Sequence, residues 1–60
     1  MGSGEKGGYI LEYIVCGNLL KVSAVDPETG KEAVVWGRRN AKWPLVQLAI
    51  GKLERLLKSS

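Results

Sequence analysis

The stretch Arg38-Arg39-Asn40-Ala41-Lys42-Trp43 is the part of the sequence best suited to binding chemistry, because it places three cations and an aromatic ring side by side. A helix is expected to begin within it, and the amino end of a helix favours anions through its backbone amides and its dipole. Arg38, Arg39, Lys42 and Trp43 are therefore candidate contacts for an anion or a nucleic acid. The competing interpretation is a solvated basic loop with Trp43 packed at the edge of the core.

The distribution of charge argues against a nucleic-acid partner. Residues 38–60 carry six cations and one carboxylate, whereas residues 1–37 carry three cations and five carboxylates. A sheet that enters a DNA groove presents several cations on one face. The strands expected here carry Lys21 and little other positive charge, so nucleic-acid binding is the second hypothesis and a protein partner is the first.

Catalytic and metal-binding residues are scarce. The chain has no histidine and a single cysteine, Cys16, which excludes an intrachain disulfide and a zinc site of the usual Cys/His kind. No carboxylate pair, activated nucleophile or glycine-rich phosphate loop is evident. We therefore expect no catalytic residue, no cofactor, no metal and no small-molecule substrate, and we expect Cys16 to be structural.

The amino end, residues 1–8, reads MGSGEKGG and is glycine-rich and polar. It has neither the apolar run of a signal peptide nor a membrane span, so we expect an unstructured tail or an expression remnant. The lone cysteine fits a reducing compartment, and we expect a cytoplasmic protein. The folded domain is expected to cover residues 9–58.

Two neighbouring stretches, residues 9–16 and 19–25, have the β-branched, aromatic and aliphatic composition of strands. Gly17 and Asn18 between them suit a type II′ hairpin turn, in which the first central residue needs a positive φ. A two-residue loop sets the register outward from the turn and pairs Cys16 with Leu19.

Residues 26–30, Asp-Pro-Glu-Thr-Gly, predict a second turn, with the aspartate bonding back to the turn backbone and the glycine left-handed. A third strand over residues 31–36 should return beside the second and end at Gly37. With Val25 opposite Glu32, one face of the sheet gathers these residues: Leu11, Tyr13, Val15, Leu20, Val22, Ala24, Ala33 and Val35.

A helix is expected from about Ala41 or Pro44, with Asn40 as its cap. At about 100° per residue its apolar side chains fall within one arc: Leu45, Val46, Ala49, Ile50, Leu53, Leu56 and Leu57. This stripe should cover the sheet face just described. The sequence thus predicts an α+β fold, a three-stranded antiparallel β-meander followed by one C-terminal α-helix.

The opposite sheet face is also apolar. The same register puts these residues on it: Ile10, Ile14, Cys16, Leu19, Val25, Val34 and Trp36. One helix cannot cover both faces, and a water-facing antiparallel sheet usually alternates apolar with polar residues. A chain of 60 residues also has little core to stabilise it.

We therefore expect an interaction module that forms a homodimer, or binds another protein, through this face. The predicted interface residues are Ile10, Ile14, Leu19, Val34 and Trp36. The competing interpretation is a solvated sheet on which scattered apolar residues have no partner.

The segment LEYIVCGNLLKVSAVDPETGKEAVVWG, followed by LAIGKLERLL, resembles an uncharacterised family of small alphaproteobacterial proteins, a domain of unknown function. The resemblance covers about residues 10–57 and rests on these positions: Gly17-Asn18, Lys21-Val22, Ala24-Val25-Asp26-Pro27, Thr29-Gly30, Leu48-Ala49-Ile50 and Lys52-Leu53. It implies a bacterial protein with this hairpin and helix, and it supplies no functional residues.

Members of that family are sometimes labelled serine hydroxymethyltransferase, but no feature of this chain suits pyridoxal phosphate. The chain departs from the family pattern at Val15, Trp36, Pro44 and Gly51. Its interface is therefore expected to differ from that of its relatives.

Overall fold

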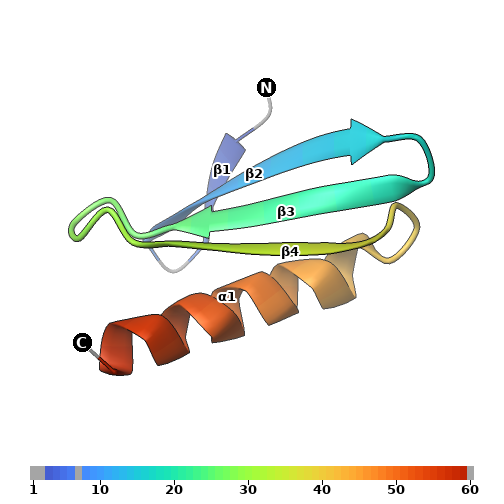
Figure 1. The fold of residues 1–60 in the computed structure, drawn as a ribbon. Coiled ribbons are helices and arrows are strands. Elements are labelled where there is room, and N and C mark those ends of the chain that lie inside the picture. Colours follow the sequence, from blue (N-terminus) through green and yellow to red (C-terminus); the bar gives the residue numbers. More distant parts are fainter. Residues whose placement is uncertain (1–2, 7, 60) are drawn as a thin grey trace.

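The computed structural model describes the backbone of residues 3–6 and the whole of residues 8–59. They form a four-stranded antiparallel sheet in the order β1-β2-β3-β4, with one helix packed on one side (Figure 1). The elements are β1 (Ser3–Lys6), β2 (Tyr9–Cys16), β3 (Leu19–Val25), β4 (Glu32–Arg38) and α1 (Lys42–Lys58). The predicted α+β meander followed by one C-terminal helix is confirmed.

The amino end differs from the expectation of an unstructured tail over residues 1–8. Ser3–Lys6 forms the short strand β1, which pairs antiparallel with β2. Gly8 precedes β2 with a φ of 88°, a left-handed conformation that glycine adopts without strain. Residues 1, 2 and 7 of the expected tail lie outside the described residues. β1 therefore covers the edge of β2 that a three-stranded sheet would leave free.

Both predicted turns are present. Gly17 has a φ of 61° and Asn18 has no positive φ, which is the type II′ pattern. In the second turn the Asp26 carboxylate accepts hydrogen bonds from the Glu28 amide at 3.3 Å and from the Thr29 hydroxyl at 2.9 Å. Gly30 is left-handed at a φ of 77°. These two turns fix the register of the meander.

The end of β4 corrects the prediction that Gly37 breaks the third strand. Gly37 lies inside β4 and pairs with Leu20, and the strand continues to Arg38. A Cβ atom at position 37 would lie 2.5 Å from Leu45 Cδ2. The glycine leaves room for the Leu45 side chain where the helix packs closely against the strand, and the strand does not end there.

The helix begins and ends close to the predicted limits, but its start differs in detail. Ala41 is the N-cap residue and no side chain caps the helix, so the prediction of Asn40 as the cap is wrong. At the other end the Ser59 amide donates to the Arg55 carbonyl at 3.1 Å. Arg55 and Lys58 lie in the last turn, where cations interact favourably with the helix dipole.

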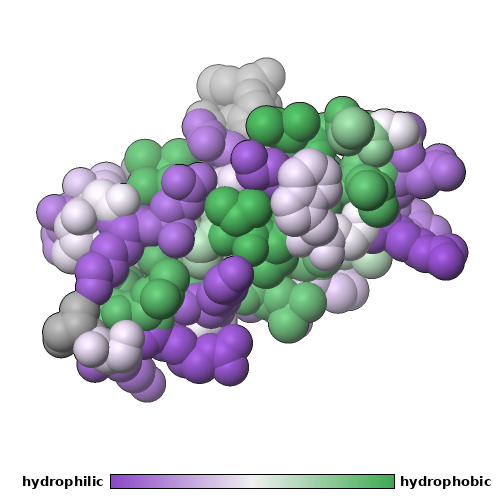
Figure 2. Space-filling view, in the orientation of Figure 1, coloured by the Kyte–Doolittle hydropathy of each residue, from purple (hydrophilic) through white to green (hydrophobic). Residues whose placement is uncertain are grey.

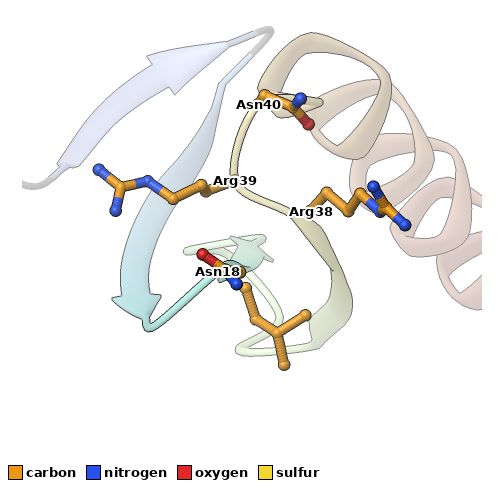
Figure 3. A pocket seen from close by; sticks show the side chains of 5 residues that line it. Asn18, Arg38, Arg39 and Asn40 are labelled. Atoms are coloured by element: carbon orange, nitrogen blue, oxygen red, sulfur yellow. The ribbon is translucent and has the colours of Figure 1, made fainter.

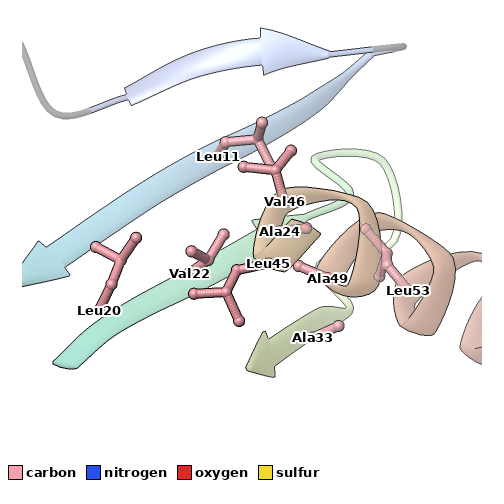
Figure 4. Packing of buried hydrophobic residues seen from close by; sticks show 9 residues of the cluster. All are labelled: Leu11, Leu20, Val22, Ala24, Ala33, Leu45, Val46, Ala49 and Leu53. Carbon is pink, nitrogen blue, oxygen red and sulfur yellow. The ribbon is translucent and has the colours of Figure 1, made fainter. Parts of the chain in front are cut away.

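The core lies between α1 and the sheet face that the helix covers, called the inner face below (Figure 4). Its buried members come from every long element: Leu11, Leu20, Val22, Ala24, Ala33, Leu45, Val46, Ala49 and Leu53. The helix packs mainly against β3 and β4. Val15, although on the inner face, is 55 % exposed because it lies near the end of β2, away from the helix.

Candidate functional site

The sheet face opposite the helix is called the outer face. The pairing of β2 with β3 and of β3 with β4 agrees with the predicted register throughout. By the alternation of side chains along each strand, the outer face carries these residues: Ile10, Glu12, Ile14, Cys16, Leu19, Lys21, Ser23, Val25, Glu32, Val34, Trp36 and Arg38. The five residues predicted as an interface all belong to it.

The largest apolar side chains of the outer face are exposed. Ile14 and Trp36 are each 55 % exposed and Leu19 is 47 % exposed. They lie toward the end of the sheet where the β2–β3 turn is. Green, hydrophobic atoms gather over this end of the sheet at the upper right of Figure 2. Ile10 and Val34, the other predicted interface residues, are half-buried.

The central residues of the outer face are less exposed to solvent than its largest apolar side chains. Lys21 pairs with both Ile14 and Trp36 and is half-buried. Ser23 is the next residue of β3 that faces the same way, and it is only 4 % exposed. Its neighbours across the strands are Glu12 and Val34. Ser23 is therefore covered by the larger side chains around it.

Cys16 lies on the outer face opposite Leu19 and is exposed as a free thiol. It is not a core residue, so the expectation of a structural cysteine has no support from packing. Within the described residues no group of His, Cys, Asp and Glu side chains is placed to hold a metal ion. The helix α1, the one helix in the described part of the chain, is too short and polar to cross a membrane.

The basic loop is tied to the β2–β3 turn. The Arg39 amide donates to the Asn18 carbonyl at 3.0 Å, and the Ala41 amide donates to the Arg38 carbonyl at 2.9 Å. A hollow of about 460 Å³ lies between the loop and the turn, lined by Asn18, Leu19, Arg38, Arg39 and Asn40. Figure 3 shows the Arg38 and Arg39 side chains pointing in opposite directions. The two guanidinium groups therefore do not converge on one anion.

Lys42, the first residue of α1, turns toward the sheet. Its Nζ atom lies 4.6 Å from the centre of the Tyr13 ring and 5.9 Å from that of Trp43. A cation over an aromatic face is held by the ring's negative potential. Lys42 therefore fastens the helix start to β2, and Trp43 remains 66 % exposed. The four predicted anion contacts are thus dispersed.

The Lys42–Tyr13 contact was not predicted, although the sequence contains the signal for it. Lys42 lies three residues before Leu45 and seven before Ala49, on the same helical stripe as the core side chains. A lysine on an apolar stripe at a helix end places its stem against the core and its ammonium at the border. Such a position is structural more often than ligand-binding.

One titrating group is perturbed at the opposite end of the sheet. Partial burial raises the pKa of the Tyr9 phenol, and the carboxylates of Glu54 and Asp26 raise that pKa further. A small hollow there is lined by Tyr9, Glu54, Leu57 and Lys58. A phenol with a raised pKa is a weaker acid, so Tyr9 itself is not poised as a base or nucleophile near neutral pH.

No curated protein and no solved structure matches the chain. A family model, described as a domain of unknown function, matches residues 6–60, which span β2, β3, β4 and α1 in full. The matched residues include the meander, its two turns and the helix, and this chain belongs to the family DUF6898, a domain of unknown function.

Proposed function

We propose that this domain is a non-catalytic interaction module whose outer face binds a second copy of the same chain. The observation that carries the proposal is the exposure of Trp36 and Ile14, each at 55 %, in one cross-strand row with Lys21. Exposed large apolar side chains gathered on one face are typical of interaction surfaces. A homodimer covers both copies of this face at once.

The size of the face sets the expected affinity. Strands of about seven residues, rising about 3.3 Å per residue and lying about 4.8 Å apart, cover a flat footprint of about 330 Å² for three strands. Stable interfaces bury about 800 Å² on each partner, so this one belongs with the small, weak interfaces. We expect a dimer that dissociates on dilution, with Kd on the order of micromolar.

The two tryptophans make a direct test possible, because one lies on the outer face and the other on the helix. A Trp43→Phe variant leaves Trp36 as the single fluorophore, and a Trp36→Phe variant leaves Trp43. Sedimentation velocity and fluorescence should be recorded on each variant over a concentration series. We expect the mass to double with concentration and the Trp36 emission to shift to the blue, while the Trp43 emission stays constant.

Charge substitutions complete the test. Trp36→Lys and Ile14→Glu should hold the chain monomeric, whereas Trp43→Lys, a matched change on the helix, should leave the dimer unchanged. Circular dichroism of each variant at low concentration separates a folded monomer from an unfolded chain. A wild-type chain that stays monomeric up to millimolar concentration contradicts the proposal.

Nucleic-acid binding through loop 38–43 is the alternative function, and the geometry of the site favours it less. Arg38 and Arg39 point apart and Lys42 lies over Tyr13. If it were the function, binding to DNA or RNA would weaken steeply with salt. Absence of any mobility shift with single- or double-stranded probes at low salt would exclude it.

A further inference from the structure

The charges of the outer face are separated along the strands. The pairing register defines four cross-strand rows, which from the β2–β3 turn outward are Cys16–Leu19–Arg38, Ile14–Lys21–Trp36, Glu12–Ser23–Val34 and Ile10–Val25–Glu32. The two rows nearest the turn each carry one cation, and the two far rows each carry one carboxylate. The face is therefore positive at one end and negative at the other.

Two identical sheets can face each other about a two-fold axis in two aligned ways. With the axis along the strands, every row meets its own copy and Lys21 lies directly over Lys21 of the partner subunit. With the axis across the strands, the rows meet in reverse order and each strand lies over its own copy, running in the opposite direction. The first arrangement opposes like charges, and the second opposes unlike charges.

The second arrangement also brings several apolar side chains together, while it places Ile14 over Glu12 of the partner subunit. It places Arg38 over Glu32 of the partner subunit and Trp36 over Val34 of the partner subunit. Leu19 then lies over Val25 of the partner subunit, so apolar meets apolar. Lys21 lies over the row that holds Ser23 of the partner subunit, beside the partner's Glu12.

We infer that the outer faces pair about a two-fold axis running across the strands, with Arg38 of each copy held by Glu32 of the other. This inference rests on the proposed self-association and specifies its geometry. Arg38 is thereby a partner-recognition residue and not an anion site. Because the contact occurs twice in each dimer, changing one residue type alters two contacts.

The test uses two charge-reversal variants. Each restores the charge pairing of the other only when the two variants form a heterodimer. Arg38 and Glu32 lie at opposite ends of β4, about 20 Å apart at about 3.3 Å per residue, so they do not meet within one chain. Arg38→Glu and Glu32→Arg should each raise the dimer Kd about tenfold, because each puts two like-charged pairs in the interface. An equimolar mixture of the two variants should recover wild-type association as a heterodimer.

The matched control is Arg39→Glu, which changes the charge equally but on a side chain pointing the other way (Figure 3). It should leave Kd unchanged. Two results would overturn the inferred axis without contradicting dimer formation, provided that the wild-type chain forms dimers. In the first, the single variants associate as tightly as the wild type. In the second, the mixture associates no more tightly than either variant alone. A wild-type chain that never associates refutes the proposed function itself, so the two failures are distinguishable.

Discussion

The two faces of the sheet are built from similar residue types and differ in what covers them. On the inner face Val22 and Ala24 are fully buried under α1. On the outer face Ile14, of the same strand pair, is 55 % exposed. Both faces are therefore apolar, whereas the described residues form one helix, which covers only the inner face. The comparison separates residues that hold the monomer together from residues free to bind another molecule.

The largest expected effect on stability comes from comparing the buried and the exposed sides of α1, represented by Leu53 and Leu48. Leu53 is fully buried and Leu48 is 57 % exposed. Leu53→Ala removes core contacts and leaves a cavity, which lowers the free energy of unfolding by about 2–5 kcal/mol. A chain of this length is stable by about 3–9 kcal/mol, so this variant should lose a large fraction of its stability.

Leu48→Ala is the matched control and should change the free energy of unfolding by less than about 0.5 kcal/mol. Urea titration at a protein concentration below the dimer Kd measures both, because binding then adds no stability. If both variants lost the same free energy of unfolding, the side of α1 that packs against the sheet would be assigned wrongly.

A second pair of variants replaces a glycine with alanine at two positions, and the expected changes in the free energy of unfolding have opposite signs. At Gly37 a new Cβ would meet Leu45 Cδ2, so Gly37→Ala should overpack the inner face and destabilise the fold by about 1–3 kcal/mol. At Gly51, in mid-helix, a Cβ would meet no atom within 4 Å, so Gly51→Ala should stabilise the fold by up to about 1 kcal/mol.

The Gly37 effect has its own internal check. In a Leu45→Ala background the clash is gone, so adding Gly37→Ala should then destabilise the chain much less than it does in the wild type. Thermal unfolding of the four chains of this double-mutant cycle gives the interaction energy. An interaction energy near zero would mean that the close approach of β4 and α1 does not limit residue 37.

The smallest expected effect lies at the border of the inner face, where Tyr9 meets the end of the helix. Burial and the Glu54 carboxylate raise the pKa of the Tyr9 phenol. The unfolded chain therefore loses this proton first, and stability falls as the pH rises above about 10 and through the folded pKa. Glu54→Gln should lower the pKa of Tyr9 in the folded chain, so the decline in stability becomes smaller and ends at a lower pH.

Ultraviolet absorbance of the phenolate, in a Tyr13→Phe background, follows Tyr9 alone and keeps an aromatic ring under Lys42. Lys58→Gln, at the rim of the same hollow, is the control for a change of net charge. A Glu54→Gln variant with an unchanged Tyr9 titration would show that the carboxylate does not act on this phenol.

The meander was predictable from sequence because local chemistry determines it. Gly17 and Gly30 take the left-handed conformations that their turns need, and the register follows from the first of these turns. The apolar stripe of the helix and the apolar excess of the outer face follow from periodicity alone. These features depend on neighbours close in the chain.

The features that were not predicted depend on residues far apart. Gly37 resembles a strand terminator until the approach of Leu45 is known. β1 has a polar, glycine-rich sequence with no strand signal, and it pairs because β2 offers it an edge. The dispersal of loop 38–43 depends on Tyr13 being placed under Lys42. Tertiary contacts decided each case.

Lys52 bears on how large any assembly of this protein can grow. Its Nζ atom donates a hydrogen bond to the Val34 carbonyl at 3.1 Å, on the edge of β4 that no strand covers. An incoming strand would have to displace this ammonium before it could lengthen the sheet. Lys52 therefore opposes growth of the sheet at this edge, which is the step by which copies of a chain add strand after strand into a fibre.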